Sequence, residues 1–174
     1  KVAPTLMAGN AAIVKPPHQN PLTLIKLTEL MIEAGVRGGA IQVITGQGAK
    51  AGAALTSHPD VHKISFTGST AVGIETAKNA ASHLAHISLE LGGNDAFIVL
   101  SDADPAVLKA ALSDARTYNN GQVCTSSKRM IVLADRYEEV LADMKEIYSG
   151  LKWGDPLEDS TTLPPMSSQA AKEK

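Results

Sequence analysis

His62–Gly73 has the sequence HKISFTGSTAVG, in which a short apolar strand runs through a glycine turn directly into a helix. Gly68 allows close approach to the backbone, and the hydroxyl groups of Ser69 and Thr70 stand where the helix begins. Such a helix start presents backbone N–H groups and a positive dipole end, which favours a phosphate site. The alternative is an ordinary turn whose hydroxyl groups only cap the helix.

The same alternation of apolar runs and helix-period segments extends along the whole chain. Strands are expected at 11–14, 41–44, 62–66, 87–90, 96–100 and 130–133. Helices are expected from Pro21 to Gly35, in a short segment ending near 57, and at 71–82, 105–118 and 137–151. This order predicts an α/β fold, an open parallel sheet with helices on both faces. The pattern restarts after the double glycine, so we expect part of one domain over 1–91 and part of a second over 92–174.

Both ends of the sequence suggest a longer protein. Residues 1–10 lack an initiating Met and are expected to run straight into the first strand, and the last residues, SSQAAKEK, are typical of a helix that is just beginning. We therefore expect an internal fragment.

Composition excludes several classes of protein. Hydrophobic residues make up 44% and charged residues 20%, as in soluble globular proteins. The formal charge of −2 without a block of one sign gives no nucleic-acid or membrane surface. The single cysteine excludes an internal disulfide, and no apolar run is long enough for a signal peptide or membrane span. We expect a cytoplasmic protein.

A second glycine turn, Gly46–Gly48, is closer to the dinucleotide fingerprint G-x-G-x-x-G, but the next glycine comes one residue too late. The five histidines include two close pairs, neither of which has the spacing of a metal site. No metal is expected.

Cys124 lies in the polar, glycine-containing segment NNGQVC, residues 119–124. A nucleophilic cysteine needs such a partly exposed position with hydrogen-bond donors nearby. A small buried cysteine is the alternative.

Glu90 ends an apolar strand and precedes Leu91, Gly92 and Gly93. Strand ends are where open α/β sheets bind ligands, and a carboxylate there can act as a general base toward water. The alternative is a surface glutamate in a turn.

Together these residues resemble the aldehyde dehydrogenase superfamily over essentially the whole chain. The resemblance is carried by four motifs in order: AGNAAIVKP (8–16), FTGSTAVG (66–73), LELGG (89–93) and NNGQVC (119–124). Glu90 and Cys124 stand 34 positions apart, as the family's base and nucleophile do. GNDAFIV (93–99) and the pair Cys124-Thr125 are somewhat closer to the succinate-semialdehyde dehydrogenase branch.

The resemblance implies a Rossmann-like dinucleotide-binding domain followed by part of a catalytic domain, and oxidation of an aldehyde to a carboxylic acid with NAD or NADP. Cys124 would be the nucleophile, its backbone N–H an oxyanion donor, and Glu90 the base that activates water. Tyr118 would line the substrate tunnel. The residues implied to bind the cofactor are Lys15, His18, Gly68, Ser69, Thr70, Ala71, Val72, Gly73 and Leu91.

The chain departs from the family's pattern at two positions. His18 stands where many NAD-using members have a glutamate, which removes a carboxylate that would repel a 2′-phosphate. Ala71 stands where many members have an acidic residue. The resemblance also implies that an asparagine oxyanion donor, a second ribose-binding glutamate and an oligomerisation strand lie outside the chain. We expect a homo-oligomer, dimer or tetramer, when complete, and an inactive isolated fragment.

Two other functions stay open from the sequence. A CoA-acylating relative would pass the acyl group to a thiol, although such relatives usually lack the glutamate, and a non-catalytic nucleotide-binding module would have an unreactive thiol. Arg116 is either a carboxylate anchor for the substrate or a member of a surface salt bridge.

Overall fold

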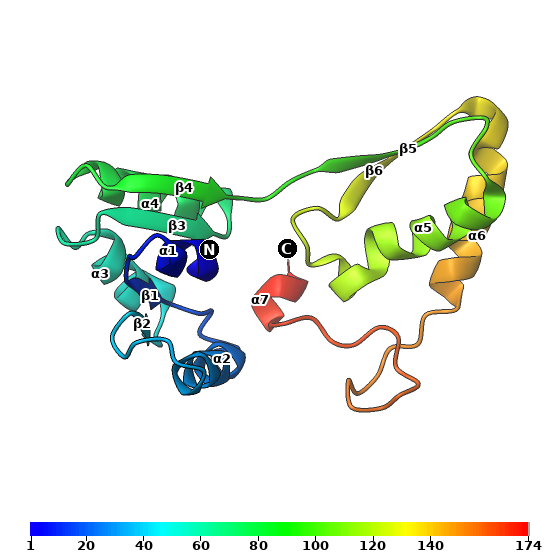
Figure 1. Ribbon diagram of the computed structural model, residues 1–174. Helices are drawn as coiled ribbons and strands as arrows, with labels where there is room; N and C mark the ends of the chain where they lie inside the picture. Colours follow the sequence, from blue (N-terminus) through cyan, green and yellow to red (C-terminus); the bar gives the residue numbers. More distant parts are fainter. Residues whose placement is uncertain (174) are drawn as a thin grey trace. The chain divides into compact units, whose positions relative to one another are not determined.

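The computed structural model describes residues 1–173, and the chain divides into two compact units, Lys1–Leu91 and Gly92–Lys174 (Figure 1). The first unit contains α1 (Val2–Met7), β1 (Ala12–Val14), α2 (Leu22–Glu33), β2 (Ile41–Val43), a π-helical turn (Gly48–Gly52), α3 (Ala53–Thr56), β3 (Lys63–Thr67), α4 (Thr70–Ala81) and β4 (His86–Glu90). The second contains β5 (Asp95–Val99), α5 (Pro105–Thr117), a 3₁₀ turn (Tyr118–Gly121), β6 (Ser127–Val132), another (Ala134–Arg136), α6 (Tyr137–Ser149) and α7 (Gln169–Lys172).

All strand pairs are parallel, which confirms the predicted α/β class. The strands form three separate two-stranded sheets, β1–β2, β3–β4 and β5–β6, so the described part of the first unit holds two pairs rather than one open sheet. A helix connects the strands of every pair, because parallel neighbours need a crossover. The alternation in the sequence predicts this orientation, but it does not specify which strands are neighbours.

The amino-terminal helix α1 differs from the prediction that residues 1–10 run directly into the first strand. Pro4 is the third residue of this helix. Proline is tolerated in the first turn, where its missing N–H would have no intrahelical partner. Gly9, at a φ of 77°, ends the segment, and the N–H groups of Gly9 and Asn10 donate to the carbonyls of Leu6 and Thr5. Pro4 is therefore compatible with this short helix.

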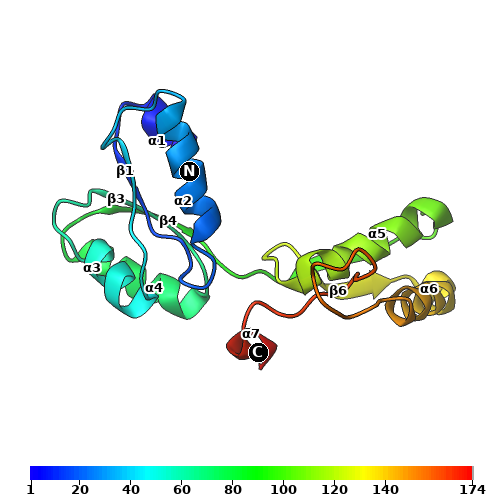
Figure 2. The same ribbon diagram turned by 90° about the horizontal axis from the view of Figure 1, so that it is seen from below.

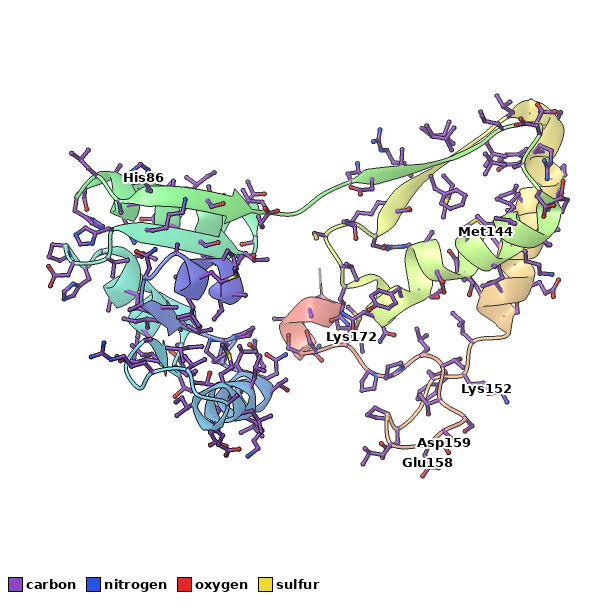
Figure 3. The ribbon with its side chains drawn as sticks, viewed as in Figure 1. His86, Met144, Lys152, Glu158, Asp159 and Lys172 are labelled. Carbon is purple, nitrogen blue, oxygen red and sulfur yellow. The ribbon has the colours of Figure 1, made fainter. Side chains whose placement is uncertain are left out.

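The core of the second unit lies between β5, α5 and α6, and Figure 2 shows the two helices side by side. Its buried residues are Val99, Leu108, Leu112 and Val140. Half-buried side chains surround them, including Met144 of α6, which Figure 3 labels. Asp104 caps α5 by accepting from the N–H groups of Ala106 and Val107. No helix among residues 1–173 is long and apolar enough to span a membrane.

Leu112→Ala is expected to lower the free energy of unfolding of this unit by about 3 kcal/mol, because a buried leucine leaves a cavity that the structure fills only in part. Leu112 is 1% exposed. Val107→Ala is the matched control on the same helix, since Val107 is 68% exposed and its loss should cost less than about 0.5 kcal/mol. Urea unfolding of both variants followed by circular dichroism measures the difference, and equal losses would contradict the assignment of the core.

Candidate active site

The turn between β3 and α4 carries most of the predicted cofactor residues. Ser69 caps α4, its Oγ accepting from the N–H of Val72 at 3.4 Å. The ring of Phe66 lies against Gly68, where a Cβ would stand 2.5 Å from a ring carbon. Like every helix, α4 leaves the N–H groups of its first turn without intrahelical partners. Thr70 and Ala71 are exposed in that turn, so the helix start is accessible to an anion.

Two contacts connect this turn to the end of β4. The N–H of Gly68 donates to the carbonyl of Glu90 at 3.0 Å, in continuation of the β3–β4 ladder. Leu91 packs on buried Gly73, where a Cβ would lie 2.6 Å from Leu91 Cδ2. Glu90 is the last residue of β4 and is exposed. The predicted base therefore lies at the carboxyl end of the strand beside the candidate phosphate turn.

Lys15 directly follows β1, at the carboxyl end of the β1–β2 sheet. Its ammonium group donates to the carbonyls of Pro16 at 2.8 Å and Gly46 at 3.3 Å. Its alkyl chain lies over Gly52, 3.6 Å from the position of a Cβ. Gly46 has a φ of 144°, a conformation for which glycine is suited. His18 lies in the exposed turn that follows. Both predicted residues are thus at the strand edge where α/β sheets bind ligands.

Cys124 is a free, exposed thiol in the second unit. It lies in the turn Val123–Ser126, which the N–H of Ser126 closes by donating to the carbonyl of Val123 at 3.1 Å. A left-handed corner precedes it: Asn119, Asn120 and Gly121 have φ values of 50°, 57° and 71°. Asparagine and glycine are the residues that best tolerate this conformation. The helix expected to reach position 118 ends at Thr117 for this reason.

Ser126 anchors the end of that turn and is not singled out by its sequence. It is buried, accepts from Arg116 Nη1 at 3.1 Å, and its hydroxyl donates to the carbonyl of Ala115 at 3.4 Å. Arg116 therefore holds the turn Val123–Ser126 against α5. It takes part in no salt bridge among the described residues, which contradicts its interpretation as a member of a surface salt bridge.

The segment Gly93–Asn94 lies against the turn Val123–Ser126. A Cβ on Gly93 would stand 2.7 Å from the carbonyl oxygen of Cys124. Lys128 donates to the carbonyl of Gly93 at 2.7 Å, and the guanidinium of Arg129 donates to that of Asn94 at 3.1 and 3.0 Å. The β5–β6 ladder is irregular at this point. The side chains of Lys128 and Arg129 therefore bind the carbonyls of Gly93 and Asn94, directly before the regular β5–β6 pairing begins.

Tyr118 is 71% exposed beside the same turn. It lines a hollow of about 240 Å³ with Asp114, Ala115, Val123, Thr125 and Ser126. The predicted substrate residue and the predicted nucleophile thus belong to one loop region of the second unit. Within residues 1–173 no group of three or more His, Cys, Asp or Glu side chains could hold a metal ion.

Comparison with known proteins gives a single family. The model of the aldehyde dehydrogenase family matches residues 1–174. Phenylacetaldehyde dehydrogenase of Pseudomonas fluorescens is 41% identical over 169 residues, which are 97% of this chain and 34% of that protein.

Two solved structures are similar to this chain. An E. coli NADP-dependent enzyme has a TM-score of 0.92 at 36% identity, covering 98% of this chain and 35% of that one. A mutant of aldehyde dehydrogenase C from Pseudomonas syringae, complexed with NAD+ and octanal, has a TM-score of 0.91 at 35% identity, with coverage of 98% and 35%. The chain thus spans about a third of the length of the relatives it matches. It belongs to the aldehyde dehydrogenase family.

Proposed function

We propose that the whole protein carrying this chain oxidises an aldehyde to a carboxylic acid, with NAD or NADP as the hydride acceptor. The observation that carries the proposal is the exposed thiol of Cys124 on a turn that Ser126 anchors and that packs closely against Gly93, in a chain of this family. A thiol buried in the core would have argued against nucleophilic chemistry.

The residues of the first unit fit a dinucleotide cofactor. The start of α4 provides backbone N–H groups for a pyrophosphate, Gly68 lies in the turn before it, and Lys15 has an ammonium group at a strand end for a ribose hydroxyl. We assign Ser69–Gly73 and Leu91 to the same cofactor region. The cofactor, when bound, supplies the acceptor for the hydride that leaves the substrate.

Cys124 begins the reaction when its thiolate sulfur bonds to the aldehyde carbon, which turns the carbonyl oxygen into an oxyanion. The backbone N–H of Cys124 stabilises that charge. Departure of the hydride restores the C=O bond and leaves a thioester on Cys124. Glu90 then takes a proton from water, whose oxygen attacks the thioester carbon, and the carbon–sulfur bond breaks. The products are the acid and the Cys124 thiolate, Glu90 releases to solvent the proton that it took from water, and the hydride acceptor has gained the two electrons.

The thiol itself provides the test of this proposal. Iodoacetamide should alkylate Cys124 in the whole protein rapidly at neutral pH, at a rate that saturating NAD+ or NADP+ alters, and the same protein should reduce the cofactor when an aldehyde is added. An unreactive thiol together with saturable cofactor binding would indicate a non-catalytic nucleotide-binding module. Product formation that requires CoA rather than water would indicate an acylating enzyme. Either result would refute the proposal.

His18→Glu is expected to lower kcat/KM for NADP+ about tenfold while changing that for NAD+ much less, because a carboxylate at this position repels a 2′-phosphate. Steady-state kinetics with both cofactors measure the ratio. His58→Glu, in the exposed loop after α3, adds the same charge elsewhere in the first unit and controls for net charge. An unchanged NADP+ to NAD+ ratio in His18→Glu would remove His18 from the cofactor site.

The substrate branch is a finer proposal. The sequence motifs 93–99 favour succinate semialdehyde, and an assay of that aldehyde beside phenylacetaldehyde and octanal tests the preference. A homo-oligomer and a cytoplasmic location also stay predictions.

A further inference from the structure

The left-handed corner Asn119–Gly121 has three residues with positive φ in a row, two of them other than glycine, and only Gln122 and Val123 separate it from Cys124. Non-glycine residues persist in this region only when the surrounding structure holds them there. Bonds within the loop give part of that support, since Gln122 donates to the carbonyl of Asn119 at 3.2 Å and its own N–H donates to the same group at 3.1 Å.

The remaining support comes from a segment about 45 positions later, Pro164–Ser167, which we call the diproline strap. The amide of Asn120 donates to the carbonyl of Pro164 and, at 3.5 Å, to that of Pro165. The amide oxygen of Gln122 accepts from the N–H of Ser167 at 3.1 Å. Two side chains of the corner region therefore reach the strap, one as donor and one as acceptor.

The strap is itself fixed on both sides. Upstream, the N–H groups of Thr162 and Leu163 donate to the carbonyl of Lys152, and Thr162 Oγ1 accepts from the N–H of Lys152 at 2.8 Å. Downstream, Ser168 caps α7. Proline has a fixed φ and no N–H, so the two carbonyls face Asn120 from a stiff backbone. In Figure 1 the orange segment after α6 turns back toward the end of α5 and leads into α7.

We propose that Asn120 and Gln122 are positioning residues for Cys124. Their bonds to the diproline strap hold the corner left-handed, and the corner in turn fixes the direction in which the chain enters the turn Val123–Ser126. The catalytic importance of these two residues rests on the proposed function. The hydrogen bonds from which their role is argued join only residues of the second unit. The side chains of Asn120 and Gln122 take no part in the chemistry themselves.

Asn120→Gly is the sharpest test, because glycine adopts the left-handed conformation freely and only the amide is lost. Asn119→Gly is the matched comparison, since the amide of Asn119 bonds within the loop alone, to the carbonyl of Gln122 at 3.4 Å. In the whole protein, Asn120→Gly should slow alkylation of Cys124 by iodoacetamide, and lower kcat, on the order of tenfold relative to Asn119→Gly, because small misplacements of a nucleophile are costly. KM for the cofactor should not differ between the two.

The alkylation rate is measured from pH 6 to about pH 10, across the ordinary pKa range of a thiol. A misplaced thiolate lowers the plateau of the alkylation rate at high pH or shifts its pH profile, whereas a loss of folding stability alone does neither. Gln122→Leu removes the bond to Ser167 together with the donation from the side-chain amide to the carbonyl of Asn119, and leaves residues 119–121 unaltered. Gln122→Glu keeps an acceptor for Ser167 and loses only that donation. Gln122→Leu should slow alkylation more than Gln122→Glu does, so the test survives if Asn120→Gly fails to fold. Equal profiles for both asparagine variants, or a wild-type profile for Gln122→Leu, would overturn the inference.

Because alkylation needs no aldehyde, these experiments can refute the proposed function and the positioning role independently. A wild-type protein that oxidises no aldehyde would refute the proposed function while the comparison of alkylation profiles still tests positioning. A fully active wild type with identical profiles for all variants would refute the positioning role alone.

Discussion

Cys124→Ala is expected to abolish aldehyde oxidation by the whole protein, lowering kcat by at least about 10⁴-fold, as removal of an enzyme's nucleophile commonly does. In the proposed mechanism the thiolate forms the bond on which both later steps depend, and no second cysteine is present in this chain. Stopped-flow measurement of cofactor reduction should show neither a burst nor a steady rate. Cofactor binding should be retained, because the predicted cofactor residues belong to the first unit.

Cys124→Ser is the matched variant, since it keeps the approximate size and polarity of the side chain. A serine hydroxyl without an activating base is a poor nucleophile at neutral pH, so the same loss is expected. Wild-type turnover in either variant would show that the chemistry does not pass through this thiol.

Glu90→Gln is expected to keep the first turnover and to slow the steady rate by about 10² to 10⁴-fold, the usual contribution of a general base. The amide has the shape of the carboxylate but takes up no proton from water, so acylation proceeds and the thioester accumulates. The carbonyl of residue 90 still accepts from the N–H of Gly68, which preserves the strand pairing. A burst of cofactor reduction followed by a slow phase is the expected record, and mass spectrometry should detect the acyl group on Cys124.

Glu75→Gln controls for the loss of one negative charge in the same unit. Glu75 is exposed on α4, where it pairs only with Lys78 at 3.6 Å, and its replacement should change kcat less than about twofold, as expected for a surface ion pair. If Glu90→Gln abolished the burst as well, Glu90 would act during acylation; a wild-type steady rate would remove it from the mechanism.

The secondary structure could be predicted from the sequence because its signals are local. The crossover pattern predicts parallel strands, and the double glycine predicts a change of unit near the observed break between Leu91 and Gly92. The assignment of the two units to cofactor binding and catalysis stays a prediction. The helix α1 differs from the prediction that residues 1–10 run straight into the first strand; Pro4 stands in its first turn, where proline is tolerated.

The candidate site shows the same contrast between local signals and contacts that join distant segments. The residues proposed to carry the chemistry are recognisable from their types and from motifs of a few positions. Their supports are not, because each joins segments far apart in the chain: Lys128 and Arg129 reach Gly93 and Asn94 across 35 positions, and Asn120 reaches Pro164 across 44. Even the short-range bond between Arg116 and Ser126 depends on how the loop after α5 turns back.

The close packing at Gly93 limits which residues position 93 can accept. The atom nearest to its missing Cβ is a backbone carbonyl oxygen of Cys124, and a main-chain atom has no alternative rotamer into which it could withdraw. In a library with every codon at position 93, selection for function should therefore return glycine alone, including against alanine. The requirement at position 93 is for empty space rather than for a reactive group, and sequencing the functional survivors of such a library would reveal it.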